Sequence, residues 1–456
     1  MDQQRSECSR RRFLALSTRA IGAAALGGPV LLRGSAASCQ ANEKLNLAVV
    51  GCGGQGRGVM GWMLGSGKVN VVALCDPDAS MIARARSDAR EAGAAAKAYE
   101  DYRRLLDDAA SFDAVLIGTP DHWHAHLCEA FMKAGKHVYC EKPLTHSVSE
   151  ARRLRELARR SKVVTQMGNQ GSASESLRRC VEIIRSGALG KIREMYHWGI
   201  GVGANEGSAE GEDPVPEGFN WDLWVGPSAM RPYKAGVYHP FNWRGWFDFG
   251  NGGLADFCCH AINLPMRALD LGYPERLVLN IREGKQTPGK AAVEFHFAAR
   301  RNLPPVVLHW MAGERPPGGA VRPLAEVFED RNPDGLLILG ETGWIHTSHW
   351  NTDGLIRLEG DRETRRVTDH EGTKSIPKTL PRTSGHSDEW IEACLGRGKT
   401  FSDFDTGGKL TEIGLAAVVA IRAGKTIEWD GERMRAKNAP EADRFVRTKY
   451  RTKWLL

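Results

Sequence analysis

A carboxylate and an imidazole stand four residues apart in the segment GGLADFCCH (252–260), as Asp256 and His260. On a helix this spacing places both side chains on one face. A carboxylate beside an imidazole fixes the tautomer of the ring and raises its basicity, which suits a general acid or base. Taken alone, the spacing is more typical of an ordinary pair on a helix surface. The interpretation therefore depends on the elements that would position the pair.

A glycine-rich turn follows the apolar run Leu45–Val50, which is predicted to be a buried parallel strand. The turn reads GCGGQG (51–56), and G-x-G-x-x-G between a strand and a helix is typical of dinucleotide binding. Gly51 permits the tight turn, Gly53 lets the backbone approach the pyrophosphate, and Gly56 lets the helix pack on the strand. The helix N-terminus then offers free N–H groups to the phosphates. We predict that Gly51, Gly53, Gln55 and Gly56 bind the cofactor.

An acidic residue closes the next predicted strand. Val69–Cys75 is apolar, and Asp76 follows it twenty residues after Gly56. An acidic residue at this place accepts hydrogen bonds from the adenosine ribose hydroxyls and would repel a 2′-phosphate. Asp76 therefore predicts NAD as the cofactor, in preference to NADP. A turn residue before Pro77 is the alternative interpretation.

Polar residues also end the later strands of the same pattern. Ala114–Ile117 runs into Gly-Thr-Pro (118–120), and His137–Cys140 runs into Glu-Lys-Pro (141–143). Ligands of parallel sheets bind beyond the carboxyl ends of the strands. The polar stretch QMGNQ (166–170) follows one more strand and is expected near the nicotinamide. Further predicted cofactor-binding residues are therefore Thr119, Pro120, His122, Glu141, Lys142 and Asn169.

Glu-Lys-Pro after a strand, with the glycine motif upstream, resembles the Gfo/Idh/MocA oxidoreductases, as do GTPDHWH (118–124) and KAGKHV (133–138). The resemblance covers nearly all of residues 45–430. It implies that Lys142 reaches the reacting carbon of the substrate and that Asp256 and His260 form the second catalytic pair. The chain departs from the family at Asn263, where the family often has Asp. Pro265 is expected to end or kink the helix.

The pattern predicts an α/β fold in two domains. A Rossmann doubly wound parallel sheet is expected over residues 44–165. A C-terminal α+β domain with an open, mainly antiparallel sheet is expected over residues 166–456 and would bind the substrate. We also expect the chain to form a homo-oligomer.

Aromatic and polar residues crowd the stretch Phe219–Phe249, just before the Asp256/His260 pair. Aromatic faces stack on the C–H faces of sugars, and Asn, His and Arg bind hydroxyl groups. A carbohydrate or polyol substrate is therefore expected, although aromatic packing between domains or subunits is an alternative for any single residue. The predicted substrate-binding residues are Lys142, His239, Asn242, Trp243, Arg244 and His260.

The expected reaction is NAD-dependent hydride transfer between a sugar or cyclitol C–H(OH) and tightly held nicotinamide. His260 would act as base, Asp256 would orient His260, and Lys142 would bind the reacting oxygen. One alternative is an NAD-dependent glycosidase that oxidises a sugar transiently. Relatives with that chemistry lack the Glu-Lys-Pro lysine, so Lys142 counts mildly against it. A dinucleotide-binding regulator is a second alternative, which retention of all three residues disfavours.

The first 38 residues are predicted to be a twin-arginine export signal. Ser9–Leu14 reads SRRRFL, an apolar stretch follows, and Ser35-Ala36-Ala37 offers a cleavage site. Cys39 follows a weak lipoprotein box, so a lipid anchor on a periplasmic protein is an open alternative. No transmembrane segment is expected in the mature chain.

Charge and cysteine spacing suggest no further ligands. Residues 1–38 supply +4 of the net charge of +7. The remaining charge of +3 is too small to favour nucleic acid as a partner. The ten cysteines show no metal-ligand spacing, so no metal site is predicted. Cys258 and Cys259 are expected to be buried packing residues.

Overall fold

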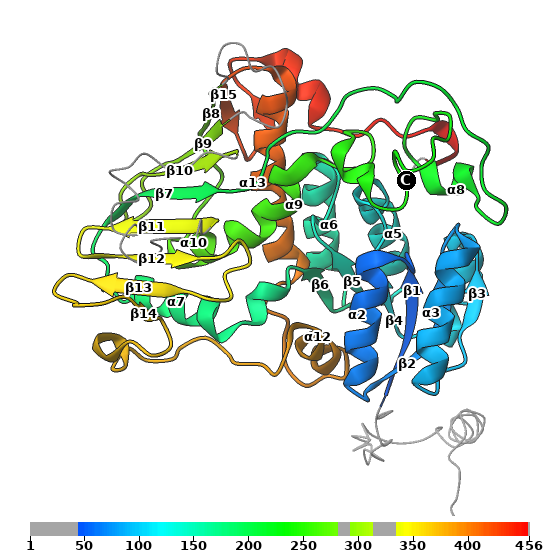
Figure 1. Ribbon diagram of the computed structural model, residues 1–456, viewed down its shortest axis with the longest axis horizontal. Helices are drawn as coiled ribbons and strands as arrows, with labels where there is room; N and C mark the ends of the chain where they lie inside the picture. The colour runs from blue at the N-terminus through cyan, green and yellow to red at the C-terminus, as the bar shows by residue number, and fades with distance from the viewer. Residues whose placement is uncertain (1–43, 281–291, 313–333, 455–456) are drawn as a thin grey trace, which may run out of the picture. The chain divides into compact units, whose positions relative to one another are not determined.

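The computed structural model describes residues 44–280, 292–312 and 334–454. The predicted leader and Cys39 lie outside these residues. The first sheet has six parallel strands in the order β3-β2-β1-β4-β5-β6 (Figure 1). Its order reverses between β1 and β4, which is the switch point where such sheets bind ligands. Its strands are β1 (Leu45–Val50), β2 (Val69–Cys75), β3 (Lys97–Tyr99), β4 (Ala114–Ile117), β5 (His137–Glu141) and β6 (Thr165–Gly168).

Helices connect the parallel strands, as a right-handed crossover requires. They are α2 (Gly54–Gly65), α3 (Ala79–Glu91), α4 (Tyr102–Asp107), α5 (Asp121–Lys133) and α6 (Val148–Arg160). All four residues of β4 are buried, which explains why its sequence is continuously apolar. Ser147 and Glu150 form a capping box that begins α6 directly after the Glu-Lys-Pro turn.

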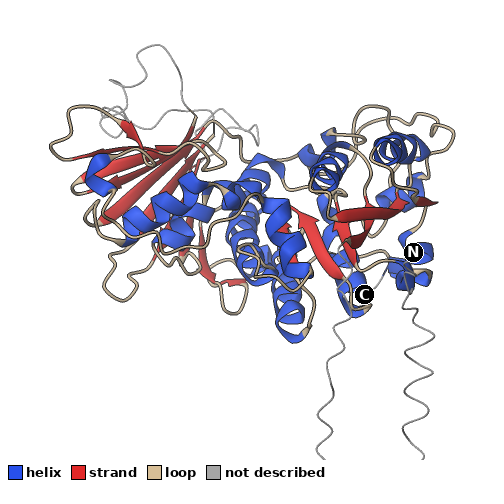
Figure 2. Ribbon diagram, turned by 90° about the horizontal axis from the view of Figure 1, so that it is seen from below, coloured by secondary structure: helices blue, strands red, loops and turns tan. Residues whose placement is uncertain are grey.

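The second sheet has ten strands in the order β14-β13-β12-β11-β7-β10-β9-β8-β15-β16. Every neighbouring pair is antiparallel except β7 and β10, so the predicted fold class is confirmed. Figure 2 shows helices packed along this sheet. Its strands are β7 (Ile192–Trp198), β8 (Arg276–Asn280), β9 (Ala292–Phe297), β10 (Val306–Met311), β11 (Gly335–Gly340), β12 (Gly343–Thr347), β13 (Leu355–Leu358), β14 (Arg365–Arg366), β15 (Ile427–Asp430) and β16 (Arg435–Ala436).

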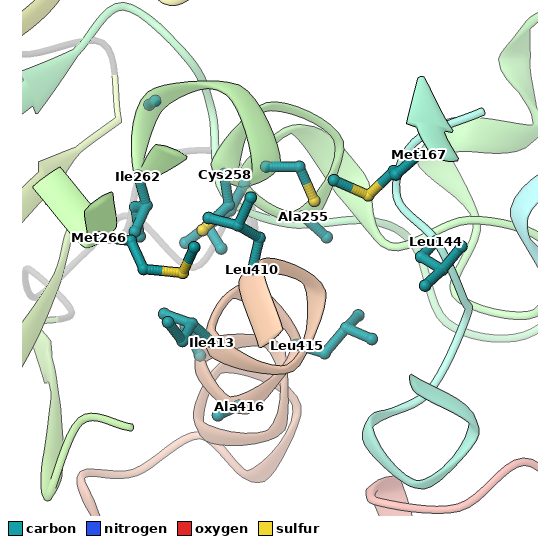
Figure 3. Packing of buried hydrophobic residues seen from close by; sticks show 14 of the residues in the cluster. Leu144, Met167, Ala255, Cys258, Ile262, Met266, Leu410, Ile413, Leu415 and Ala416 are labelled. Atoms are coloured by element: carbon teal, nitrogen blue, oxygen red, sulfur yellow. The ribbon is translucent and has the colours of Figure 1, made fainter. Parts of the chain in front are cut away.

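One long helix, α13 (Phe404–Ala423), joins the two sheets because it packs against both α6 and α9 (Figure 1). Figure 3 shows Leu410 of α13 among buried side chains that include Met167 and Cys258. A Cβ on Gly414 would lie 2.9 Å from the Cβ of Cys258, so glycine allows the two helices to approach closely. The remaining helices are α7 (Glu175–Arg185), α8 (Trp221–Val225), α9 (Gly252–Ala261), α10 (Asn263–Ala268) and α12 (His386–Cys394).

The cysteine pair and Pro265 take the structural roles that the sequence suggests. Cys258 and Cys259 are buried, unbridged thiols on α9. Helix α9 ends at Ala261, and Pro265 falls in the first turn of α10. A proline is tolerated in a first turn because its missing N–H would have no intrahelical partner there. None of the described helices is long and apolar enough to cross a membrane.

A buried ion-pair network ties α6 to α13. Glu412 is 1% exposed and accepts hydrogen bonds from Arg152 (2.7 Å) and Arg155 (2.7 Å). Both arginines also donate to the Tyr273 hydroxyl. Removing one partner of such a network leaves buried charges uncompensated.

We expect Glu412→Gln to lower the free energy of unfolding by about 3 kcal/mol, because Arg152 and Arg155 lose their buried counter-charge. The matched control is Asp405→Asn. It removes the other carboxylate that binds Arg155, but its side chain is 43% exposed, so a loss of at most about 1 kcal/mol is expected. Urea unfolding of both variants measures the difference, and equal losses would contradict this view of the network.

Candidate active site

A cleft of about 440 Å³ runs along the carboxyl ends of the parallel strands. Its opposite wall comes from residues between 223 and 260, including the middle and C-terminal half of α9, and from Trp350. The lining brings together most of the residues that the sequence singled out. Those residues are Gly51, Gly53, Gln55, Asp76, Thr119, Pro120, Glu141, Lys142, His239, Trp243, Arg244, Asp256 and His260.

The glycine loop has the form that a pyrophosphate requires. Gly51 has φ +85°, and a Cβ on Gly56 would lie 2.2 Å from the carbonyl oxygen of Gly51, so glycine is needed at both places. No side chain caps the N-terminus of α2, which leaves its first N–H groups free for an anion. The Thr119 hydroxyl, beside the loop just after β4, is buried without a partner among the described residues. These features fit NAD.

Asp76 lies where the ribose of that dinucleotide would be bound. It is 8% exposed and accepts hydrogen bonds from the backbone N–H groups of Cys52 (2.8 Å) and Asp78 (2.9 Å). Burial raises the pKa of Asp76 to about 6, although the two backbone donors oppose the shift. Asp76 is therefore mainly ionised at neutral pH.

Lys142 and Asp256 meet in the cleft, although 114 residues separate them. The Lys142 Nζ lies 2.6 Å from Asp256 Oδ1 and also donates to the Asp256 carbonyl oxygen at 3.2 Å. On the other side, Arg244 Nε is 3.9 Å from Asp256 Oδ2. The carboxylate thus lies between two cations and orients the ammonium group of Lys142.

His260 lines the same cleft but does not pair with Asp256. No hydrogen bond between them is found in the described chain, and His260 Nδ1 is buried without a partner there. The predicted orienting contact from Asp256 to His260 is therefore not what this geometry shows. Burial, reinforced by the positive charge of Lys142, holds the pKa of His260 well below its usual value. His260 is consequently a neutral imidazole at physiological pH.

Glu141 is a second titratable group in the wall beside Lys142. Burial raises its pKa to about 7, against the opposing effect of Lys142. Its carboxylate accepts a hydrogen bond from Gln170 at 2.7 Å. Gln55 of the glycine loop also bonds to it, so Glu141 connects the end of β5 to the loop.

Four of the predicted binding residues do not line the cleft. Gly56 packs beneath it. His122 binds the carbonyl oxygens of Phe249 (3.3 Å) and Trp224 (3.1 Å). Asn169 is fully buried and donates to the Cys259 carbonyl at 3.3 Å, so it holds β6 against α9. Asn242 donates to Gly236 at 2.7 Å.

The aromatic stretch divides into packing residues and cleft residues. Trp221 stacks on Trp224 at 4.8 Å, within a buried cluster that also holds Tyr238. His239 bonds to Asp78 at 2.9 Å, two residues beyond Asp76, and so lies toward the ribose end of the cleft.

Arg244 belongs to the cleft part of this stretch. Its guanidinium lies 4.4 Å from the Phe241 ring and 4.2 Å from the Trp243 ring. Stacking between two rings fixes the cation that faces Asp256.

Several cleft residues were not predicted. Phe257 lies one residue beyond Asp256, and its ring is 5.4 Å from Lys142 Nζ. Trp350 packs on Phe257 at 5.8 Å and is 47% exposed. Phe257 could have been found from its place between Asp256 and His260. Trp350 comes from the connection after β12, and no motif indicates that this connection reaches the cleft.

Comparisons with known proteins agree with the two-part fold. Residues 45–169 match the model of an oxidoreductase family with an NAD-binding Rossmann fold, GFO_IDH_MocA. Residues 194–276 match the model of the C-terminal α/β domain of the same family.

Individual relatives align over shorter segments. A myo-inositol 2-dehydrogenase of Thermotoga maritima is 33% identical over 95 residues, which are 21% of this chain and 28% of the relative. A glycosyl hydrolase family 109 protein of Shewanella amazonensis is 29% identical over 157 residues, 31% of this chain and 34% of the relative. The chain therefore spans about a third of the length of these relatives.

Among solved structures, a levoglucosan dehydrogenase in complex with NADH and levoglucosan superposes with a TM-score of 0.57. It is 16% identical, and the match covers 84% of this chain and 99% of that one. At this identity the likeness concerns the fold. Both domain models belong to one family, so residues 45–169 and 194–276 of this chain are similar to the two domains of the Gfo/Idh/MocA oxidoreductases, the first of which is an NAD-binding Rossmann fold.

Proposed function

We propose that the protein transfers a hydride between a sugar or cyclitol C–H(OH) and NAD. The observation that carries the proposal is that Lys142, Asp256 and His260 line the same cleft as the glycine loop. An ammonium donor and a neutral imidazole at one end of a dinucleotide cleft are the groups that alcohol oxidation requires.

The side chains divide the work of moving the proton. NAD, held by Gly51–Gly56 and Asp76, supplies the hydride acceptor when bound. His260 accepts the hydroxyl proton, because the ring is kept neutral by burial. Lys142 donates a hydrogen bond to the substrate oxygen and stabilises the negative charge that develops there. Asp256 positions Lys142 through their 2.6 Å contact.

The substrate class rests on the wall opposite the glycine loop. Trp243, Phe257 and Trp350 provide apolar faces that suit the C–H faces of a sugar ring, and Arg244 can donate to its hydroxyls. The names of the relatives, a myo-inositol dehydrogenase and a levoglucosan dehydrogenase, support the same class.

Cleavage of a glycoside through transient sugar oxidation is the second candidate. The similarity to a glycosyl hydrolase family 109 protein favours it. It would use the same cleft but would release an aglycone and leave NAD unchanged. A dinucleotide-binding regulator is less consistent with three reactive groups that converge in one cleft.

We expect Lys142→Ala and His260→Ala each to reduce turnover by at least ~10²-fold while NAD binding is retained, since each removes a group that acts on the substrate proton or oxygen. Absorbance at 340 nm and product analysis over a panel of sugars, cyclitols and glycosides measure turnover. Fluorescence titration measures NAD binding. Asp405→Asn, far from the cleft, serves as control. Near-normal turnover in either cleft variant would remove that residue from the mechanism.

The pH dependence separates Glu141 from His260. Glu141 ionises near pH 7, and its carboxylate then holds Gln170 and the glycine loop in place. We therefore expect kcat/KM for oxidation to rise as the pH increases through about 7, and Glu141→Gln to abolish this rise. Because the pKa of His260 lies well below its usual value, protonation of His260 should lower kcat/KM only at a more acidic pH. A rise near pH 7 that persists in Glu141→Gln would contradict this assignment.

We further propose that the protein is exported by the twin-arginine route with NAD already bound. That pathway carries folded proteins, and a periplasm offers no obvious supply of NAD. The cleft is suited to retention, because residues 218–239 are attached to the ribose end of the sheet. Ala79 N–H donates to Gly218 at 2.9 Å, and Asn220 N–H donates to Pro77 at 2.8 Å. Bound NADH would then be converted back to NAD within the site, by reducing a second sugar or by re-reducing the first.

Protein isolated from the periplasm and desalted should contain close to one NAD per chain and should react without added cofactor. Empty protein with a millimolar Kd for NAD would contradict retention.

Arg10→Lys with Arg11→Lys should leave folded, NAD-loaded protein in the cytoplasm, whereas the control Arg19→Lys should be exported. Export of the double variant would exclude the twin-arginine route. Release from membranes by Cys39→Ala would support a lipid anchor.

A further inference from the structure

A second cavity, of about 510 Å³, lies where α7 and α10 end and where β9 turns into β10. It shares no lining residue with the dinucleotide cleft. Its polar lining residues are almost all arginines, namely Arg185, Arg267, Arg300 and Arg301, and its one carboxylate belongs to Asp270.

Three of the four arginines can offer their charge to the cavity. The Arg267 guanidinium is used elsewhere, since it stacks on the Phe401 ring at 3.6 Å and donates to the Phe401 carbonyl at 2.6 Å. In the described part of the chain, no carboxylate lies within ion-pair distance of Arg185, Arg300 or Arg301. Three guanidiniums against one carboxylate leave the lining positive.

Two of these guanidiniums are held in place by one helix end. Arg185 donates to the Arg267 carbonyl through Nε (3.2 Å) and Nη2 (2.8 Å). Arg300 Nε donates to the Leu269 carbonyl at 3.0 Å. Both carbonyls belong to the C-terminal end of α10, where cations are favoured. Capping this helix end does not require Arg301, which is the third arginine. Its side chain makes no hydrogen bond or ion pair within the described residues.

Two tight turns border the cavity, each with a non-glycine residue of positive φ. Asp270 has φ +51° and Arg301 has φ +46°. They are two of the four non-glycine residues with positive φ in the described chain, and both line this one cavity. Both belong to tight turns: Asp270 follows the end of α10, where the Leu271 N–H donates to the Met266 carbonyl at 3.1 Å, and Arg301 lies in the two-residue hairpin turn between Arg300 and Leu303. These turns shape the rim of the cavity.

We propose that this cavity binds a phosphate group, either as the free ion or on a small metabolite. Arginine forks match the oxygen geometry of phosphate, and a dianion compensates the charges of Arg185, Arg300 and Arg301, for which no carboxylate partner is found among the described residues. The volume exceeds that of a single phosphate ion, so there is room for a small group attached to it. Asp270 opposes the anion and sets a limit on affinity.

Calorimetric titration of the full-length protein with inorganic phosphate and with glucose 6-phosphate, at constant ionic strength, tests the proposal. Arg185→Gln with Arg301→Gln should weaken binding at least ~10-fold, because two charge-assisted donors are lost. Asp270→Asn should tighten binding, and Asn tolerates the positive φ at this position. The matched control, Arg160→Gln with Arg366→Gln, removes two exposed arginines elsewhere and should leave the Kd unchanged.

Tighter binding of glucose 6-phosphate than of phosphate would assign a phosphorylated metabolite, and equal affinities would assign the free ion. The proposal is overturned if neither ligand binds the unmodified protein. It is also overturned if the Arg185/Arg301 variant binds as well as the parent, or if the control loses as much affinity. Both titrations measure binding and not turnover, so the result is independent of the proposed dehydrogenase activity.

Discussion

The contact between Lys142 and Asp256 requires two distant parts of the chain to be held within 2.6 Å. Lys142 follows the last residue of β5, whereas Asp256 belongs to α9, which packs against α13 and α10. Neither charge could be this well buried alone, since both side chains are about 15% exposed, and each compensates the other. Most of the structure can be understood as the means of keeping α9 at the carboxyl end of the parallel sheet.

Helix α13 provides that means. It contacts α6 through the Glu412 network and α9 through the close approach at Gly414. Asn169 adds a hydrogen bond from the end of β6 to the backbone of α9. The helix that carries Asp256 and His260 is thus positioned by packing and by a buried polar contact to the Rossmann domain.

Burial then assigns different states to groups of similar type. Asp256 lies between two cations and serves as their counter-charge. Burial raises the pKa of Glu141 to about 7, although the neighbouring Lys142 charge opposes the shift. His260 remains neutral beside the Lys142 charge. The division of labour between a cationic hydrogen-bond donor and a neutral base therefore follows from desolvation and from which partners each group meets.

The sequence alone determined the parallel sheet, the glycine loop, Asp76 and the strand-end residues Thr119, Glu141 and Lys142. These depend on local order, because a strand, a turn and a helix in succession place such residues at one sheet edge. Spacing also placed Asp256 and His260 on one helix, but it could not reveal that Asp256 pairs with Lys142. That choice depends on how α9 meets β5, which is a contact across 114 residues.

The same limit explains the aromatic stretch and Trp350. Composition could not distinguish Trp221 and Tyr238, which pack on each other away from the cleft, from Trp243 and Arg244, which line it. Nor could it show that His239 binds Asp78 or that Trp350 reaches Phe257. Only tertiary structure decided these points, because the partner of a side chain in a long connection is set by packing between segments that sequence periodicity does not relate.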